Sequence, residues 1–79
     1  MAWRPPKRLL VRGKWVEVRQ VDQGTLRDIF ADDPDEHLYG GWDDETKTIY
    51  LLRSMSPSLK NHKYWHEVLH MLVDRFLDP

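Results

Sequence analysis

The sequence SPSLKNHKYWHEVLHMLVDRFL at residues 56–77 sets the architecture of this chain. Ser56 followed by Pro57 is a typical helix start, because a serine side chain caps free backbone N–H groups and proline suits the first helical position. Apolar residues then recur at the i, i+3, i+4, i+7 spacing that places them on one helical face. We expect an amphipathic helix to about Leu77, with a buried stripe of Trp65, Val68, Leu69, Leu72, Val73 and Phe76.

Within this helix, His66, Glu67 and His70 form the HExxH pattern of many zinc hydrolases. Residues four apart lie one above the other on a helix, so the two imidazoles converge on one metal ion. We expect His66 and His70 to bind Zn²⁺ and Glu67 to act as general base on the zinc-bound water. At about 100° per residue, both histidines flank the apolar stripe and Glu67 lies farther toward solvent. The alternative is a pair of surface histidines without a metal.

A catalytic zinc ion needs a third protein ligand. Asp74 continues the i, i+4, i+8 row of His66 and His70 and is the leading candidate in the chain. About 12 Å of helical rise separates positions 66 and 74, which favours a hydrogen bond between Asp74 and His70, or an ion pair with a nearby cation, over metal binding. The other candidates are His62 on the same row, Asp35, Glu36 and His37 in a preceding loop, Asp78 and the Pro79 carboxylate.

The rest of the chain has the pattern of two β-hairpins separated by a short helix. Four short runs are rich in β-branched and aromatic residues or alternate in polarity, which predicts strands at residues 9–11, 15–21, 38–42 and 47–53. Residues 25–30 place three apolar side chains at helical spacing. We therefore expect one α+β domain over residues 1–79, with an antiparallel β-sheet of three or four strands packed on the long C-terminal helix.

The composition excludes several classes of protein. The chain has no cysteine, so disulfides and thiolate zinc sites are excluded, and a reducing, cytoplasmic location is expected. No apolar run approaches the roughly 20 residues that span a bilayer, and the N-terminus lacks the apolar core of a signal peptide. We expect no membrane partner. The oligomeric state is not predicted by any of these features.

The net charge of −1 hides a segregation of charge along the chain. Residues 1–20 contain six basic residues and one acidic residue, whereas residues 21–46 contain nine acidic residues and one basic residue. The favoured interpretation is that the two segments attract one another in the fold. A basic strand that contacts an acidic partner or nucleic acid is the alternative. Nucleic acid is not an expected partner, because only this charge run points to it.

From Tyr39 onward, the chain resembles the zincin-type metallopeptidases of the ImmA/IrrE kind and the small phage and prophage proteins related to them. Residues 39–43, 48–51 and 65–74 follow that family's order of strand, strand and HExxH helix. HExxH is the one specific motif among them. The resemblance implies a minimal zincin-like fold with His66 and His70 as zinc ligands and Glu67 as general base. It places Asp74 where the family often has a histidine or an aspartate.

The resemblance also implies where the substrate binds and which ligand is missing. In zincin-like proteins, the strand beside the helix binds an extended substrate by pairing with its free edge, and residues 47–53 are the expected strand. Members of the family usually place a glutamate ligand on a following helix, whereas this chain ends nine residues after His70.

Two functions follow from these observations. The first is a zinc-dependent metallopeptidase, encoded by a phage or a related element, that hydrolyses peptide bonds. The second is a non-catalytic zincin-fold protein that keeps a metal site and binds a phage or host regulatory partner. The short tail after His70 favours the second function, and the intact Glu67 favours the first.

Overall fold

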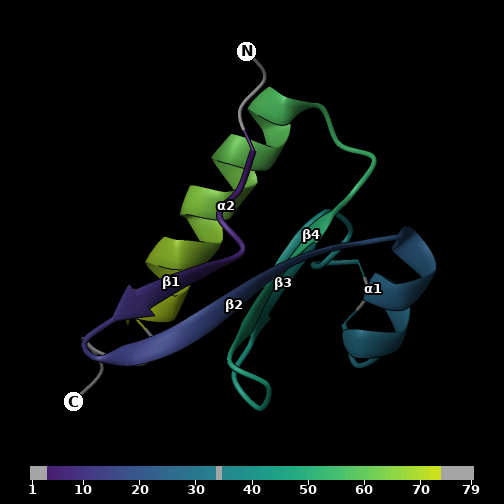
Figure 1. Ribbon diagram of the computed structural model, residues 1–79. Helices are drawn as coiled ribbons and strands as arrows, with labels where there is room; N and C mark the ends of the chain where they lie inside the picture. Colours follow the sequence, from purple (N-terminus) through teal and green to yellow (C-terminus); the bar gives the residue numbers. More distant parts are fainter. Residues whose placement is uncertain (1–3, 34, 74–79) are drawn as a thin grey trace.

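The computed structural model describes residues 4–33 and 35–73, which form a four-stranded β-sheet and two helices (Figure 1). In chain order, the elements are β1 (Arg8–Val11), β2 (Lys14–Val21), α1 (Gln23–Ile29), β3 (Gly40–Asp43), β4 (Thr48–Leu52) and α2 (Pro57–Leu72). The α+β class and the long C-terminal helix are confirmed. Both hairpins and the short helix also lie where the sequence predicts them, with shifts only at their ends.

The sheet is mixed, and the expectation of a purely antiparallel sheet is wrong. Its strand order is β1-β2-β4-β3, with antiparallel pairing of β1 with β2 and of β3 with β4. The central pair, β2 with β4, is parallel, and Val18 lies opposite Ile49. The reason is the connection after β2. α1 and the following loop lead into β3, which runs in the direction opposite to β2. The β3–β4 turn reverses the chain once more, so β4 runs in the same direction as β2.

β4 lies inside the sheet, so the expectation that residues 47–53 offer a free edge is also wrong. Both sides of β4 are paired, and four of its five residues are buried. A run of large apolar residues suits a central strand, because such strands are covered on both faces. The short strand β3 occupies the edge instead and packs beside α2. β3 is therefore the strand whose outer edge adjoins the histidine-bearing helix.

The core lies between the sheet and α2 (Figure 1). Its buried members come from β2, β4 and α2, and they are Val16, Val18, Ile49, Leu51, Tyr64, Val68 and Met71. The predicted stripe on α2 is therefore partly wrong. Trp65, Leu69 and Val73 are 59%, 60% and 46% exposed, and Phe76 lies outside the described residues.

The apolar arc of α2 is wider than the sheet that covers it. Tyr64 and Trp65 are consecutive residues, and so are Val68 and Leu69. Consecutive side chains on a helix point about 100° apart. The sheet covers the side of Tyr64 and Val68 and leaves the neighbouring apolar side in solvent. The buried face of α2 is therefore rotated around the helix axis relative to the expected face. The polar residues of the helix accordingly differ in exposure from what the sequence predicts.

The short helix α1 contacts β4 and begins with a side-chain cap. The backbone N–H of Thr25 donates to Asp22 Oδ1 over 2.8 Å, which satisfies one of the free donors at the helix start. Leu26 is 1% exposed and anchors the helix. The helix ends at Ile29, and Phe30 follows as its cap. Phe30 is thereby placed against β4, where its ring meets Tyr50 edge-on with 6.1 Å between centroids.

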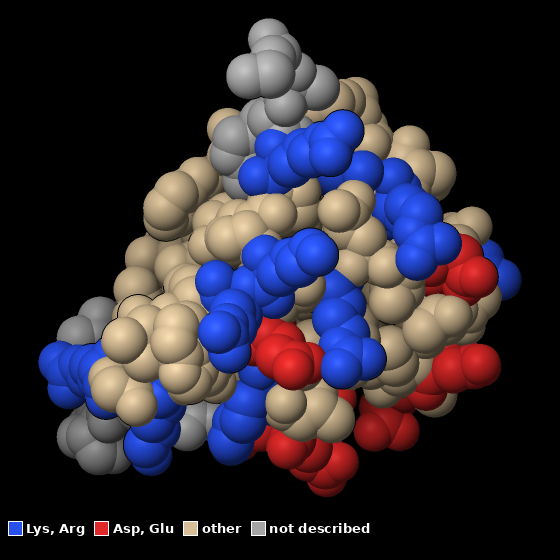
Figure 2. Space-filling view, in the orientation of Figure 1, with Lys and Arg blue, Asp and Glu red and all other residues tan. Residues whose placement is uncertain are grey.

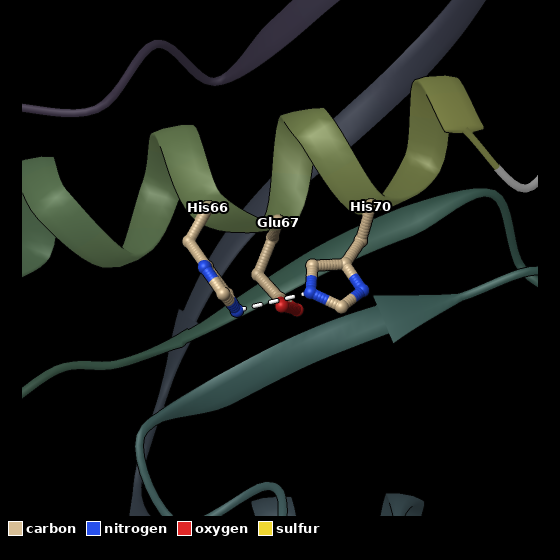
Figure 3. Close-up of side chains that lie close together, drawn as sticks. All are labelled: His66, Glu67 and His70. Carbon is tan, nitrogen blue, oxygen red and sulfur yellow. Dashed lines mark hydrogen bonds between the residues drawn. The ribbon is translucent and has the colours of Figure 1, made fainter.

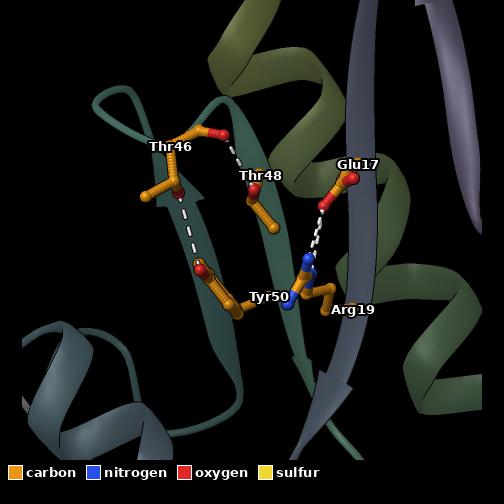
Figure 4. Close-up of polar contacts among 5 residues, drawn as sticks. All are labelled: Glu17, Arg19, Thr46, Thr48 and Tyr50. Carbon is orange, nitrogen blue, oxygen red and sulfur yellow. Dashed lines mark hydrogen bonds and ion pairs between the residues drawn. The ribbon is translucent and has the colours of Figure 1, made fainter.

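The segregated charges occupy different parts of the surface. Basic side chains gather over β1 and β2 on the face seen in Figure 2, and acidic side chains gather mainly toward its lower right. Local contacts also pair charges within each part. Arg19 pairs with Glu17 on β2 at 2.9 Å (Figure 4), and Lys47 pairs with Asp44 in the β3–β4 turn at 3.3 Å. None of the helices among the described residues has the length and apolar character needed to cross a membrane.

Candidate metal centre

The start of α2 fixes the register of the HExxH residues. The backbone N–H of Leu59 donates to Ser56 Oγ over 3.4 Å, and Pro57 occupies the first turn, as the sequence predicts. From there the helix runs without a break to Leu72, so residues 66, 67 and 70 keep regular helical spacing. Val68 and Met71 anchor the same turns in the core. The three side chains therefore extend from a regular helix that is packed against the core.

The two histidines converge as their spacing predicts (Figure 3). His66 Nε2 and His70 Nε2 lie 3.0 Å apart, and their ring centroids are separated by 4.5 Å. Zinc binds imidazole nitrogen at about 2.0–2.1 Å, so two nitrogens on a tetrahedral ion lie about 3.3 Å apart. The observed separation is close to that value. Both side chains are exposed, which leaves the nitrogens accessible to an ion from solvent.

Glu67 is buried, contrary to the expectation that it lies toward solvent. It is 5% exposed, because α2 turns this side of the helix toward the sheet. Lys63, one turn earlier, places its Nζ 3.8 Å from Glu67 Oε1 and is itself mostly covered. A buried carboxylate is stabilised by such a partner, since a lone buried charge is costly. Glu67 is therefore held in place beside the two imidazoles rather than free in solvent.

His66, Glu67 and His70 border a cavity of about 320 Å³ between α2, β3 and the loop that precedes β3. Their donor atoms all lie within 4.8 Å of one another. Imidazole nitrogen is a donor that zinc accepts, and a carboxylate beside the two imidazoles can act as general base, so these residues fit the ion. Among the described residues, the cavity is lined by Glu36, His37, Trp42, Lys63, His66, Glu67 and His70.

The candidates for a third metal ligand have different outcomes. Asp74, Asp78 and the Pro79 carboxylate lie outside the described residues. His62 lines a second hollow that shares His66 with the cavity, and neither His62 nor Asp35 is part of the cavity lining. Glu36 and His37 do line the cavity, which no spacing in the sequence reveals, because the loop position depends on the fold. Among the described residues, neither belongs to the compact donor group.

His37 has a defined position at the cavity. Its ring stacks on Phe30 with 4.2 Å between centroids and 21° between planes. A Cβ atom added at Gly41 would lie 2.5 Å from His37 Nδ1 and 2.8 Å from the Phe30 ring. The imidazole therefore occupies space that only glycine leaves free on this strand. From the sequence alone, His37 is only one of several loop candidates for metal binding.

Comparison of the chain with protein-family models, curated proteins and solved structures finds no match. The resemblance to zincin-type metallopeptidases therefore still depends on the residues of the chain itself.

Proposed function

We propose that this protein is a small zinc-dependent peptidase of the zincin type, with His66 and His70 as metal ligands and Glu67 as general base. The observation that carries the proposal is a pair of imidazole nitrogens 3.0 Å apart with a buried carboxylate beside them at the wall of a cavity. A purely structural zinc site needs no general base. The burial of Glu67 next to the histidines therefore favours hydrolysis, and the lack of cysteine favours a cytoplasmic location.

Zinc held by the two imidazoles would polarise a substrate carbonyl and lower the pKa of a coordinated water to about 7. Glu67 would accept a proton at its carboxylate as the attacking oxygen bonds to the carbonyl carbon. It would then pass that proton to the nitrogen of the leaving amine as the peptide bond breaks. Lys63 would keep the carboxylate oriented between these transfers, since its ammonium lies 3.8 Å from Glu67 Oε1.

The edge strand β3 supports a peptide as the substrate class. β3 is an edge strand, lies beside α2, and contributes Trp42 to the cavity lining. An extended peptide that pairs with the outer edge of β3 would pass the cavity with its backbone carbonyls toward the histidines. This assignment replaces residues 47–53, which the sheet encloses on both sides.

Replacement of Glu67 with glutamine tests the proposal. The amide cannot take the proton, so cleavage of a fluorogenic mixed-sequence peptide library should fall by about a hundredfold or more, while bound zinc is retained. Glu45→Gln is the matched control, because Glu45 is exposed in the β3–β4 turn, and it should cleave like wild type. Equal cleavage by the Glu67→Gln variant, or no cleavage by the zinc-loaded wild type, would contradict the peptidase assignment.

A second function has its own supporting observation. Trp65, Leu69 and Val73 form an exposed apolar stripe on α2, with His62 and His66 beside it. Such a surface is typical of a helix that contacts another protein. On this account the protein is a zincin-fold interaction module of phage origin, and its cellular effect depends on the stripe rather than on Glu67. Retention of that effect in Glu67→Gln, with its loss in a Trp65→Ser, Leu69→Ser variant, would favour this function.

A further inference from the structure

We propose that His37 is a catalytic residue that donates a hydrogen bond to the substrate oxygen on which negative charge develops. This inference depends on the proposed zinc peptidase function and extends it to a residue outside the HExxH motif. His37 comes from the loop before β3, whereas the metal-binding residues come from α2. Both sets line the same cavity.

The position of His37 suits contact with a bound molecule rather than with the metal. The compact donor group among the described residues is His66, Glu67 and His70, whose donor atoms lie within 4.8 Å of one another. His37 lines the same cavity of about 320 Å³ but lies outside that group. A molecule bound between His37 and the metal pair would therefore touch both.

His37 is also held in place before any substrate arrives. Its ring is stacked on Phe30 at 4.2 Å, and Phe30 is held by edge contact with Tyr50 of β4. Nδ1 is the ring atom that lies against Gly41, so we assign Nε2 as the donor. A donor fixed in advance stabilises developing charge more effectively than a mobile one, because little reorganisation is needed during the reaction.

The other polar residues of the cavity are less suited to this role. Lys63 is engaged with Glu67 at 3.8 Å, and Glu36 is an exposed acid that would repel a developing negative charge. His66 and His70 are committed to the metal in the proposed function. Of the described polar side chains that line the cavity, His37 and the indole of Trp42 therefore remain as N–H donors, and His37 is the one on the loop before β3.

The test uses the full chain loaded with Co²⁺ and acetohydroxamate, a small anion that places oxygen on a bound metal. The visible absorption of Co²⁺ reports both metal affinity and anion affinity without a peptide substrate. His37→Ala should weaken acetohydroxamate binding by about tenfold to a hundredfold, the usual effect of losing a hydrogen bond to a charged group. Co²⁺ affinity should stay within about threefold of wild type, and His37→Gln, which keeps a donor, should recover part of the loss.

Gly41→Ala provides a second variant that keeps the imidazole but displaces it, because the new Cβ would collide with His37 and Phe30. It should weaken acetohydroxamate binding in the same direction. Gly24→Ala is the matched control, since its Cβ meets only Asp22 Oδ1 at 3.7 Å, and it should bind like wild type. Thermal unfolding of each variant establishes that it is folded.

The outcomes separate this inference from the function on which it depends. Unchanged anion affinity in His37→Ala, with Co²⁺ still bound, overturns the role of His37 and leaves the metal site intact. A loss of Co²⁺ as large as that in His66→Ala would make His37 a metal ligand and would also overturn the assignment. Failure of the wild type to bind Co²⁺ or Zn²⁺ overturns the proposed function and this inference with it.

Discussion

Glu67 is 5% exposed, although His66 and His70 beside it in the motif face solvent. The convergence of the two imidazoles was predictable, because the i, i+4 relation is a property of any regular helix. The burial of Glu67 was not, because it depends on which side of α2 the sheet covers. The same limit applies to His37, whose place at the cavity depends on its stacking with Phe30 and on the open space over Gly41.

Asp22 offers a test of a single capping residue through its pKa. The backbone N–H of Thr25 donates to Asp22 Oδ1 and holds the pKa of Asp22 below its ordinary value of about 3.9. A lowered folded-state pKa contributes stability that is fully present above the unfolded-state pKa. That contribution is lost as the pH falls through the lower, folded-state pKa.

We expect Asp22→Ala to melt at a lower temperature than wild type at pH 7, and this difference to shrink as the pH falls below about 4. Asp22→Asn should stay closer to wild type at pH 7, because asparagine also caps helices well. Thermal unfolding followed by circular dichroism between pH 2 and pH 7 measures both effects. A difference between Asp22→Ala and wild type that is constant over this range would exclude a titrating cap.

α2 is the element for which the predicted and the observed buried faces differ most. Its start, length and amphipathic character follow from Ser56, Pro57 and the apolar spacing. Its buried face did not follow, because the apolar residues cover a wide arc and only part of that arc meets the sheet. Periodicity identifies an apolar side of a helix, but it does not say how far around that side the partner extends.

Two substitutions test which face of α2 is buried. Met71→Ala should lower the free energy of unfolding by about 2–5 kcal/mol, because Met71 is 0% exposed and its removal leaves a cavity. Leu69→Ala should lower it by only about 0.5 kcal/mol, because an exposed side chain loses little on truncation. Urea unfolding of the zinc-free variants gives both values. The reverse order would place the predicted stripe, and not the observed one, in the core.

The pairing of the strands could also be predicted only in part from the sequence. Each hairpin was predictable from turn residues and strand composition, because hairpin pairing is local in sequence. The parallel contact between β2 and β4 joins strands separated by α1, a loop and β3. Nothing in the two strand sequences specifies that contact directly. The buried run of β4 does indicate a central strand in retrospect, since four of its five residues are buried.

The whole molecule carries three surface features around a small core: a basic surface, an exposed apolar stripe and a cavity. The basic surface lies over β1 and β2 (Figure 2), the exposed apolar residues lie along α2, and the cavity lies between α2 and β3. A chain of 79 residues has a limited core, so ligand binding should contribute noticeably to its stability. If zinc binds the folded chain and not the unfolded chain, it would raise the free energy of unfolding by about 2.7 kcal/mol when free zinc is at a hundredfold excess over Kd.

The most direct measurement is the zinc content and melting temperature of the wild type beside the His66→Ala, His70→Ala double variant, each with and without a chelator. We expect one zinc ion per wild-type chain, a melting temperature that falls on chelation, and neither property in the double variant. A matched His62→Ala variant should behave like wild type, because His62 belongs neither to the lining of the cavity nor to the compact donor group of the described residues. Zinc content that is the same in the double variant as in the wild type would contradict the metal centre.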